Sequence, residues 1–238
     1  MKFDAIIIGA GPAGSTAALL LARAGWSVAV VEKAVFPRRK VCGEFISAPT
    51  LTLLEQAGIT QSLLANAGPE VREVAVYAGE RVVACPMPRS DGPAPYGRAL
   101  GREHLDSLLI EGALRAGATV LQPWRVRSWA RDSNGYVCRI AGKAREDTAE
   151  LAAPVLIAAH GSWDTGRVQL PGTDERAAPS DLLAFKANFI GGALPRGRMP
   201  LVAFPGGYGG LVHSDTGRIS FSCCIRRDAL AACRSEAP

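Results

Sequence analysis

Residues 40–47 read Lys-Val-Cys-Gly-Glu-Phe-Ile-Ser and place a thiol, a glycine and a carboxylate side by side at Cys42, Gly43 and Glu44. A thiol can supply a proton, but with an ordinary pKa of about 8.5 it needs a specific environment to be reactive. The basic run at residues 38–40 could provide the positive potential for it. A plainer interpretation makes Cys42 a small buried hydrophobe and Glu44 a loop carboxylate. These residues by themselves leave both interpretations open.

A second chemical feature precedes this stretch, the sequence Gly-Ala-Gly-Pro-Ala-Gly at residues 9–14. Gly9 allows a tight turn, Gly11 lets the backbone approach a pyrophosphate, and Gly14 permits a helix to pack closely on a strand. The pyrophosphate would lie at a helix N terminus, where free N–H groups and the dipole favour anions. Glu32 can accept hydrogen bonds from ribose hydroxyls, and it would repel a 2′-phosphate. The pattern predicts a dinucleotide site that disfavours NADP and leaves FAD and NAD open.

These residues need a strand–helix–strand unit to position them, and the hydrophobic pattern predicts one. Residues 4–8 form an apolar run that suits a buried parallel strand. Residues 15–24 read as a helix that ends at Gly25, and residues 26–33 read as the second strand. A strongly amphipathic helix is predicted over residues 101–118.

Strands dominate the remaining pattern. Residues 71–86 alternate well enough to predict a hairpin, and Asn134 and Gly135 mark a further turn. Strands of a second sheet are predicted at residues 181–190, 200–204 and 210–225. We therefore expect an α/β fold in which a Rossmann-like domain with a parallel sheet is interleaved with a mainly antiparallel β domain.

Composition excludes several classes of protein. A hydrophobic fraction of 48% over 238 residues and a mean hydropathy of +0.11 indicate a core-forming globular protein rather than a disordered one. The net charge of +5 comes from scattered basic residues, which argues against nucleic-acid binding and suits an anionic cofactor or an acidic lipid surface. The six cysteines include no Cys-x-x-Cys pair, so no metal site is expected. The expected compartment is the cytoplasm, with peripheral membrane contact left open.

Several motifs together resemble a known family. The N-terminal unit followed by Gly-Arg-x-x-Leu-Asp-x-x-Leu at residues 101–109 resembles FAD-dependent oxidoreductases of the para-hydroxybenzoate hydroxylase fold. Within that group the chain is most similar to the geranylgeranyl reductase family, whose cysteine–glycine pair after the ribose-binding acid is matched by Cys42 and Gly43. The stretches at residues 184–189 and 204–212 match the family's substrate-domain strand and glycine turn.

The resemblance implies FAD as the cofactor and NAD(P)H as a transient reductant. It places Gly43 beside the isoalloxazine ring and implies that Arg102 reaches the flavin nucleotide. It also suggests Cys42 and Glu44 as catalytic residues, the first positioning the ring or supplying a proton and the second tuning that proton's availability. The residues expected to bind the cofactor are Gly9, Gly11, Ala13, Gly14, Glu32, Lys33, Gly43, Arg102 and Val126.

The chain departs from the family in two places. Many flavoproteins of this fold have an aspartate–glycine pair where this chain has His160 and Gly161. The family's later glycine–aspartate–alanine segment has no counterpart, because a short polar tail follows Arg227. We therefore expect an FAD-binding domain over residues 1–70 and 98–165, and an incomplete substrate domain over residues 71–97 and 166–238.

The predicted function is an FAD-dependent oxidoreductase that reduces an alkene in a small, apolar or polyprenyl substrate. Phe185, Phe189, Phe204 and Tyr208 are expected to form one apolar substrate wall. Two alternatives stay open: a flavin-dependent monooxygenase of the aromatic hydroxylase type, and a truncated nucleotide-binding module without catalytic activity.

Overall fold

The computed structural model describes residues 1–92, 94–144, 146–161 and 178–236. Its contacts divide the chain into two compact units. The first unit consists of Met1–Arg38, Ala57–Ile59 and Glu103–Thr173, and the second of Arg39–Gln56, Thr60–Arg102 and Asp174–Pro238. Residues 39–56, expected in the FAD-binding part, fall in the second unit. The predicted division of roles between cofactor and substrate stays a prediction.

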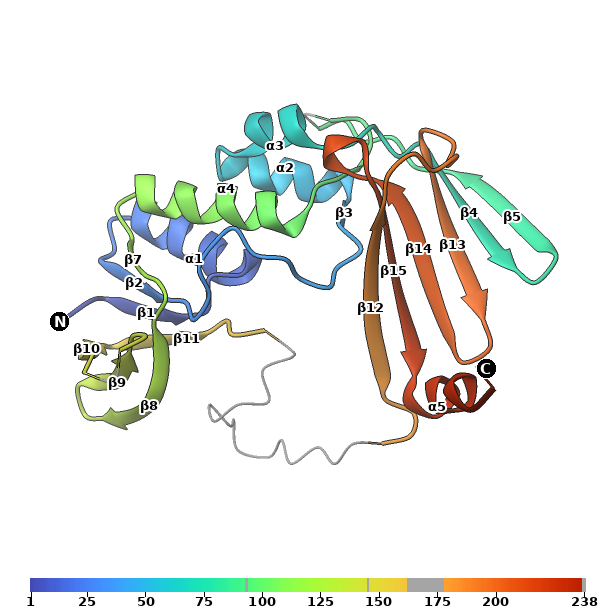
Figure 1. The fold of residues 1–238 in the computed structure, drawn as a ribbon. Helices are drawn as coiled ribbons and strands as arrows, with labels where there is room; N and C mark the ends of the chain where they lie inside the picture. The colour runs from blue at the N-terminus through green and yellow to red at the C-terminus, as the bar shows by residue number, and fades with distance from the viewer. Residues whose placement is uncertain (93, 145, 162–177, 237–238) are drawn as a thin grey trace. The chain divides into compact units, whose positions relative to one another are not determined.

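The first unit is built on a four-stranded parallel sheet with the order β11-β1-β2-β7 (Figure 1). Every residue of β1 (Ala5–Ile8) and β2 (Val28–Val31) is buried, as expected for parallel strands that are covered on both faces. The outer strands are β7 (Thr119–Leu121) and β11 (Val155–Ala158). The carboxyl ends of all four strands meet at one edge, where open α/β sheets bind ligands.

Two helices cover one face of this sheet (Figure 1). Helix α1 (Pro12–Arg23) connects β1 to β2 and begins with a proline, whose fixed φ and missing N–H suit the first helical position. Helix α4 (Arg102–Arg115) precedes β7. As predicted, the chain leaves α1 through Gly25, which has a left-handed φ of +87°.

A three-stranded antiparallel sheet covers the other face. Its strands are β8 (Arg125–Asp132), β9 (Gly135–Ala141) and β10 (Thr148–Ala153). Buried side chains of β9 and β10 form one hydrophobic core with Ile6, Ala29 and Val31 of the parallel sheet. The sheets are therefore packed face to face within the first unit.

The second unit is built on a six-stranded sheet with the order β12-β15-β14-β13-β4-β5. Its strands are β4 (Glu73–Ala78), β5 (Arg81–Pro86), β12 (Leu182–Phe189), β13 (Arg198–Phe204), β14 (Gly207–His213) and β15 (Ile219–Arg226). Neighbours run antiparallel except β4 and β13, which run parallel. The predicted strand over residues 210–225 is two strands, because a turn with the 3-10 helix η1 (Asp215–Gly217) interrupts it.

Short elements complete the second unit. Strands β3 (Phe45–Ile46) and β6 (Arg98–Ala99) pair with each other, and α2 (Ala48–Gln56) and α3 (Thr60–Asn66) follow β3. The residues after β15, expected to be a short polar tail, form helix α5 (Arg227–Glu236). The alanines between its charged residues have the highest helix propensity.

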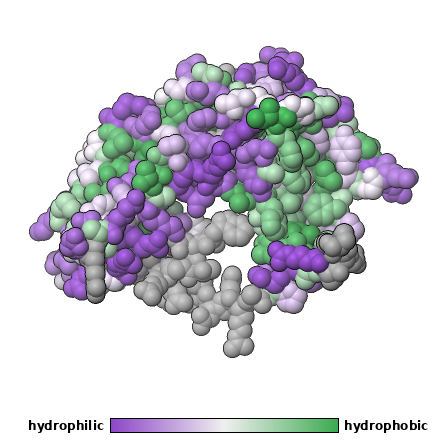
Figure 2. Space-filling model, in the orientation of Figure 1, coloured by the Kyte–Doolittle hydropathy of each residue, from purple (hydrophilic) through white to green (hydrophobic). Residues whose placement is uncertain are grey.

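The predicted α/β class is confirmed, with its parallel sheet and its mainly antiparallel second sheet. Figure 2 shows a hydrophobic surface over the strands β12 to β15 of the second unit. Exposed large apolar side chains of this sheet include Phe185 and Phe189 on one face, and Leu201 and Tyr208 on the other. Within the described ranges, no helix is both long enough and apolar enough to cross a bilayer.

Candidate functional site

The glycine-rich turn after β1 leaves no room for side chains. Gly9 has a φ of +98°, and a Cβ added there would lie 2.5 Å from the carbonyl oxygen of Ala159. A Cβ added at Gly14 would lie 1.9 Å from the carbonyl oxygen of Gly9. The tight turn and the close helix packing expected from these two glycines are therefore present.

The N terminus of α1 presents backbone donors at this turn. Gly11 is the N-cap residue, makes no side-chain capping bond, and is followed by no acidic residue in the first turn. The first hydrogen bond of the helix runs from the N–H of Ser15 to the carbonyl of Gly11. The N–H groups of Ala13 and Gly14 thus have no acceptor one turn earlier in the helix, and they fit the pyrophosphate of a dinucleotide.

The carboxylate of Glu32 lies at the carboxyl end of β2, where it is 4% exposed. It accepts hydrogen bonds from the N–H groups of Ala10 and Ala34, each at 2.8 Å. These bonds connect the end of β2 to the glycine turn. Because each carboxylate oxygen can accept more than one hydrogen bond, Glu32 keeps acceptor capacity for ribose hydroxyls. The side chain of the neighbouring Lys33 is exposed.

Arg38 is a site residue whose acidic partners the sequence interpretation did not name. It lies between two carboxylates of the first unit, and its effect on the potential near Cys42 stays a prediction. Its Nη2 atom is 3.7 Å from Oε2 of Glu32 and 3.5 Å from Oδ2 of Asp106, whose side chain is fully buried on α4. An acid on the apolar face of a helix, between buried leucines, was the signal in the sequence for such a partner.

His160 follows β11 and lies beside the glycine turn. A Cβ added at Gly9 would be 2.9 Å from the Cα atom of His160. The Nδ1 atom of His160 is buried and has no hydrogen-bond partner among the described residues. His160 is therefore next to the predicted pyrophosphate site.

The positions of two other predicted cofactor residues do not by themselves indicate a contact with the cofactor. Val126 lies in β8 beside a shift in the strand register, half-buried against the core of the first unit. Arg102 is the first residue of α4 and belongs to the second unit. Contact of either residue with the cofactor stays a prediction.

The second unit holds the Cys42–Glu44 loop. Glu44 has a φ of +63°, in the left-handed region that non-glycine residues rarely adopt, and is 3% exposed. Its N–H contacts Sγ of Cys42 at 3.4 Å, and its carbonyl accepts a hydrogen bond from the N–H of Leu100 at 3.1 Å. A Cβ added at Gly43 would lie 3.3 Å from Oγ of Ser222, so this loop lies directly against β15.

The side chain of Glu44 enters a buried cluster of four charged residues, here called the four-charge cluster: Glu44, Lys186, Asp215 and Arg218. Oε1 of Glu44 pairs with Nζ of Lys186 and lies 3.3 Å from Nη2 of Arg218. The same Nη2 atom donates to Oδ1 of Asp215 at 2.8 Å. None of the four side chains is more than 11% exposed. Two carboxylates thus face two cations with little access to solvent.

Asp215 also connects the cluster to the start of α4. Its Oδ1 atom accepts hydrogen bonds from the N–H of Gly101 at 2.9 Å and from Oγ of Ser214 at 2.7 Å. Burial alone would raise the pKa of Asp215, but the hydrogen bonds from Ser214 and Gly101 and the charge of Arg218 bring the pKa below its ordinary value. Asp215 is therefore ionised at neutral pH.

Sequence reasoning found Glu44 but missed its three partners. Lys186 is the one charged residue in the run Leu-Leu-Ala-Phe-Lys-Ala-Asn-Phe, and Asp215 and Arg218 stand in a turn. A single charged residue inside a mostly apolar strand was the one signal available. Its partner could not be named, because Lys186 and Glu44 are 142 positions apart.

The expected aromatic wall is wrong. The strand register places Phe185, Phe189 and Phe204 on one face of the six-stranded sheet. Tyr208 lies on the opposite face, together with Lys186. Because successive side chains of a strand alternate between faces, these four aromatic residues cannot line a single surface. Of the four, only Tyr208 shares the face that the Cys42–Glu44 loop contacts.

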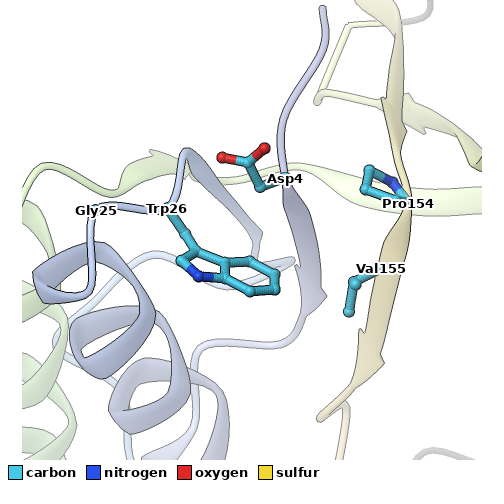
Figure 3. A pocket seen from close by; sticks show the side chains of 5 residues that line it. All are labelled: Asp4, Gly25, Trp26, Pro154 and Val155. Atoms are coloured by element: carbon cyan, nitrogen blue, oxygen red, sulfur yellow. The ribbon is translucent and has the colours of Figure 1, made fainter.

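A pocket of about 470 Å³ in the first unit is lined by Asp4, Gly25, Trp26, Pro154 and Val155 (Figure 3). Asp4 and Val155 stand at the amino ends of β1 and β11. The glycine turn follows the carboxyl end of β1. This pocket is therefore at the opposite edge of the sheet from the predicted dinucleotide site.

Comparisons with known proteins show the family of the chain. Residues 2–189 match the family described as FAD binding domain. The menaquinone reductase of Mycobacterium tuberculosis H37Rv is 32% identical over 159 residues, which are 67% of this chain and 38% of the relative. The geranylgeranyl diphosphate reductase of Rhodobacter capsulatus is 33% identical over 175 residues, which are 73% of this chain and 41% of the relative. The predicted resemblance to geranylgeranyl reductases is confirmed.

The fold is also shared with enzymes of another kind. The solved structure of the myxobacterial chondrochloren halogenase, a FAD-dependent halogenase, superposes with a TM-score of 0.79 at 21% identity. That match covers 99% of this chain and 55% of the halogenase. This chain spans about two fifths of the length of the curated relatives it matches.

Proposed function

Because the chain belongs to the FAD binding domain family, we propose that it is the cofactor-binding part of an FAD-dependent oxidoreductase that acts on an apolar or polyprenyl substrate. The observation that carries the proposal is the uncapped N terminus of α1 at the carboxyl edge of the parallel sheet, next to a buried Glu32. Two relatives are named reductases, one of menaquinone and one of geranylgeranyl diphosphate. These names support a reductase with an apolar substrate.

The residues of the first unit fit FAD. The amides of Ala13 and Gly14 would hold the pyrophosphate, and Glu32 would accept hydrogen bonds from the ribose. The positive charge of Arg38 partly neutralises the carboxylates of Glu32 and Asp106. This reduces the repulsion between these carboxylates and a nearby phosphate. When bound, FAD would accept a hydride from NAD(P)H and deliver it to an alkene of the substrate.

The residues of the second unit would act at the flavin ring. Because Gly43 has no side chain, the flavin ring could lie close to the backbone there. Cys42 can supply the proton that must accompany hydride transfer to an alkene. Glu44 holds the loop that carries both residues. Arg102 would neutralise part of the charge of the flavin nucleotide.

A flavin-dependent monooxygenase is the second candidate, because an FAD-dependent halogenase shares this fold. Reduced flavin reacts with oxygen in that class of enzyme, whereas a reductase uses the electrons on its substrate. Oxygen uptake that rises with substrate and NAD(P)H would favour the monooxygenase. Substrate reduction under nitrogen would favour the reductase.

The first test is the visible absorption spectrum of the purified chain after incubation with FAD and desalting. We expect retained flavin bands. Replacement of Gly11→Val should weaken FAD binding at least about 100-fold, equivalent to about 2.7 kcal/mol, because the new side chain blocks backbone approach to the pyrophosphate. Titration calorimetry with FAD would measure the change.

The matched control is Ala24→Val at the exposed C-terminal end of the same helix, where FAD affinity should not change. A Gly11→Val variant that binds FAD as the parent does would overturn the assignment of the N-terminal site. If the unmodified chain retains no flavin, the proposed function fails for these 238 residues.

A further inference from the structure

We propose that Lys186, Arg218 and Asp215 are positioning residues for the flavin-facing backbone of the second unit. Through Glu44 they fix the Cys42–Gly43 segment, and through the N–H of Gly101 they fix the start of α4. The inference rests on the proposed function for what these segments would face. The contacts themselves lie entirely within the second unit.

Glu44 is the centre of this arrangement and occupies an unfavourable state. Its backbone is left-handed, its side chain is fully buried, and its Oε2 atom has no hydrogen-bond partner among the described residues. A buried acceptor without a partner and a left-handed non-glycine backbone each lower the stability of a fold. Such a residue persists only where other interactions stabilise it. For Glu44, these interactions are the ion pairs with Lys186 and Arg218.

Lys186 provides the first anchor. It lies on β12, paired in register with Ser222 of β15, and a Cβ added at Gly43 would lie 3.3 Å from Oγ of that serine. The loop is thus attached to the sheet by the charge pair at Glu44, and at Gly43 it lies too close to β15 to admit a side chain without a shift. A loop held at two adjacent points has little freedom to move Cys42.

Arg218 and Asp215 provide the second anchor. Arg218 bridges Glu44 and Asp215, and Asp215 accepts the N–H of Gly101, which directly precedes Arg102. The carbonyl of Glu44 also accepts the N–H of Leu100. The segment before α4 and the Cys42–Glu44 loop are therefore joined by side-chain and backbone bonds, so displacement of one should displace the other.

Charge balance makes the cluster cooperative. Two carboxylates and two cations are buried together, and removal of any one leaves an uncompensated buried charge. Removal of a carboxylate and its cation together restores the balance. The four residues should therefore behave as a unit in double-mutant cycles rather than as independent contributions.

The test measures the access of a reagent to Cys42. The chain is treated with iodoacetamide at a pH above the ordinary thiol pKa of about 8.5, so that the rate reports access rather than ionisation. Mass spectrometry follows the alkylation of Cys42 and, in the same sample, of the exposed Cys85. Lys186→Met should raise the alkylation rate of Cys42 about tenfold, while the rate of Cys85 stays constant. A tenfold change corresponds to a free energy of about 1.4 kcal/mol, which is within the range of interaction energies between residues in contact.

Three further variants sharpen the result. Glu44→Gln should raise the Cys42 rate as Lys186→Met does, and the double variant should be no faster than either single variant. Lys186→Arg keeps the cation and should stay within about twofold of the parent. Lys143→Met removes an exposed lysine of the first unit and should change nothing.

The outcomes separate this inference from the proposed function. An unchanged Cys42 rate in folded Lys186→Met overturns the positioning role, even if the parent retains FAD. A parent without flavin whose variants nevertheless show the expected Cys42 rates overturns the proposed function and keeps the positioning role. If Lys186→Met does not fold, Lys186→Gln, which keeps an N–H donor without the charge, replaces it, and its Cys42 rate decides.

Discussion

At the scale of single residues, the four-charge cluster decides how the loop at Cys42 is held. Asp215 shows the balance of forces most clearly. Burial works against its ionisation, yet three hydrogen-bond donors around it lower its pKa below the ordinary value. A carboxylate held in this way stabilises the folded state only while it is ionised.

The folded protein should therefore lose stability in acid through Asp215. Because its folded pKa is lowered, its contribution is complete above the unfolded pKa of about 3.9 and is lost as the pH falls through the folded value. Asp215→Asn should lower the free energy of unfolding at pH 7 by about 3 kcal/mol, because Arg218 loses a buried partner. It should also flatten the loss of stability below about pH 4, measured by urea unfolding.

The matched control is Asp228→Asn. The pKa of Asp228 is also lowered, by a hydrogen bond from Arg226, but this pair, which joins the last residue of β15 to α5, is exposed. Solvent screens such pairs, so the free energy of unfolding should change little. Equal effects of the two substitutions would contradict the role given to burial.

At the scale of elements, close packing of α1 decides the shape of the dinucleotide turn. Gly14 of α1 and Gly112 of α4 are both helical glycines of the first unit, but their surroundings differ. A Cβ at Gly14 would meet a backbone oxygen at 1.9 Å, whereas a Cβ at Gly112 would meet only side-chain carbons of Leu19 and Ile59 at 3.5 Å or more. The packing around position 14 therefore leaves no room for a side chain, whereas the packing around position 112 leaves room for a methyl group.

The two glycines should respond to alanine with opposite signs. Gly14→Ala should lower the free energy of unfolding by about 3 kcal/mol, because the backbone must move to admit the methyl group. Gly112→Ala should raise it by about 0.5–1 kcal/mol, since alanine favours the helix and the methyl group has room. Urea unfolding followed by circular dichroism measures both, and destabilisation by Gly112→Ala would contradict the packing described.

At the scale of the whole molecule, the described residues of each unit include a hydrophobic core of that unit. The first unit has a core between its two sheets that includes Ile140 and Leu151. The second unit has a smaller core formed by Val71, Ala99 and Val212. The tryptophans of the described residues, Trp26, Trp124 and Trp129, all belong to the first unit, and Trp163 lies outside the described residues.

We expect the two units to unfold separately. Val212→Ala should lower the stability of the second unit by about 2 kcal/mol. It should shift the urea transition seen by circular dichroism and leave the tryptophan fluorescence transition in place. Ile140→Val, with a cost of about 1 kcal/mol in the first unit, should shift the fluorescence transition. A common shift of both probes in Val212→Ala would show one cooperative unit instead.

The sequence by itself determined the parallel unit, the glycine turn and the family. These features are local: apolar runs, glycines and one acid within residues 4–33 encode a strand, a turn, a helix and a second strand. Backbone preference and burial act over a few residues, so their pattern can be read along the chain. The same reasoning predicted the hairpin of β4 and β5 and helix α4.

The tertiary structure alone decided which charges meet and which aromatic residues share a face. Glu44 reaches Arg218 over 174 positions, and Gly101 reaches Asp215 over 114. Tyr208 is separated from Phe185 and Phe204 by strand register, which a shift of one residue would reverse. Such pairings depend on the order and register of strands that are far apart in the chain, and no local preference of these residues encodes them.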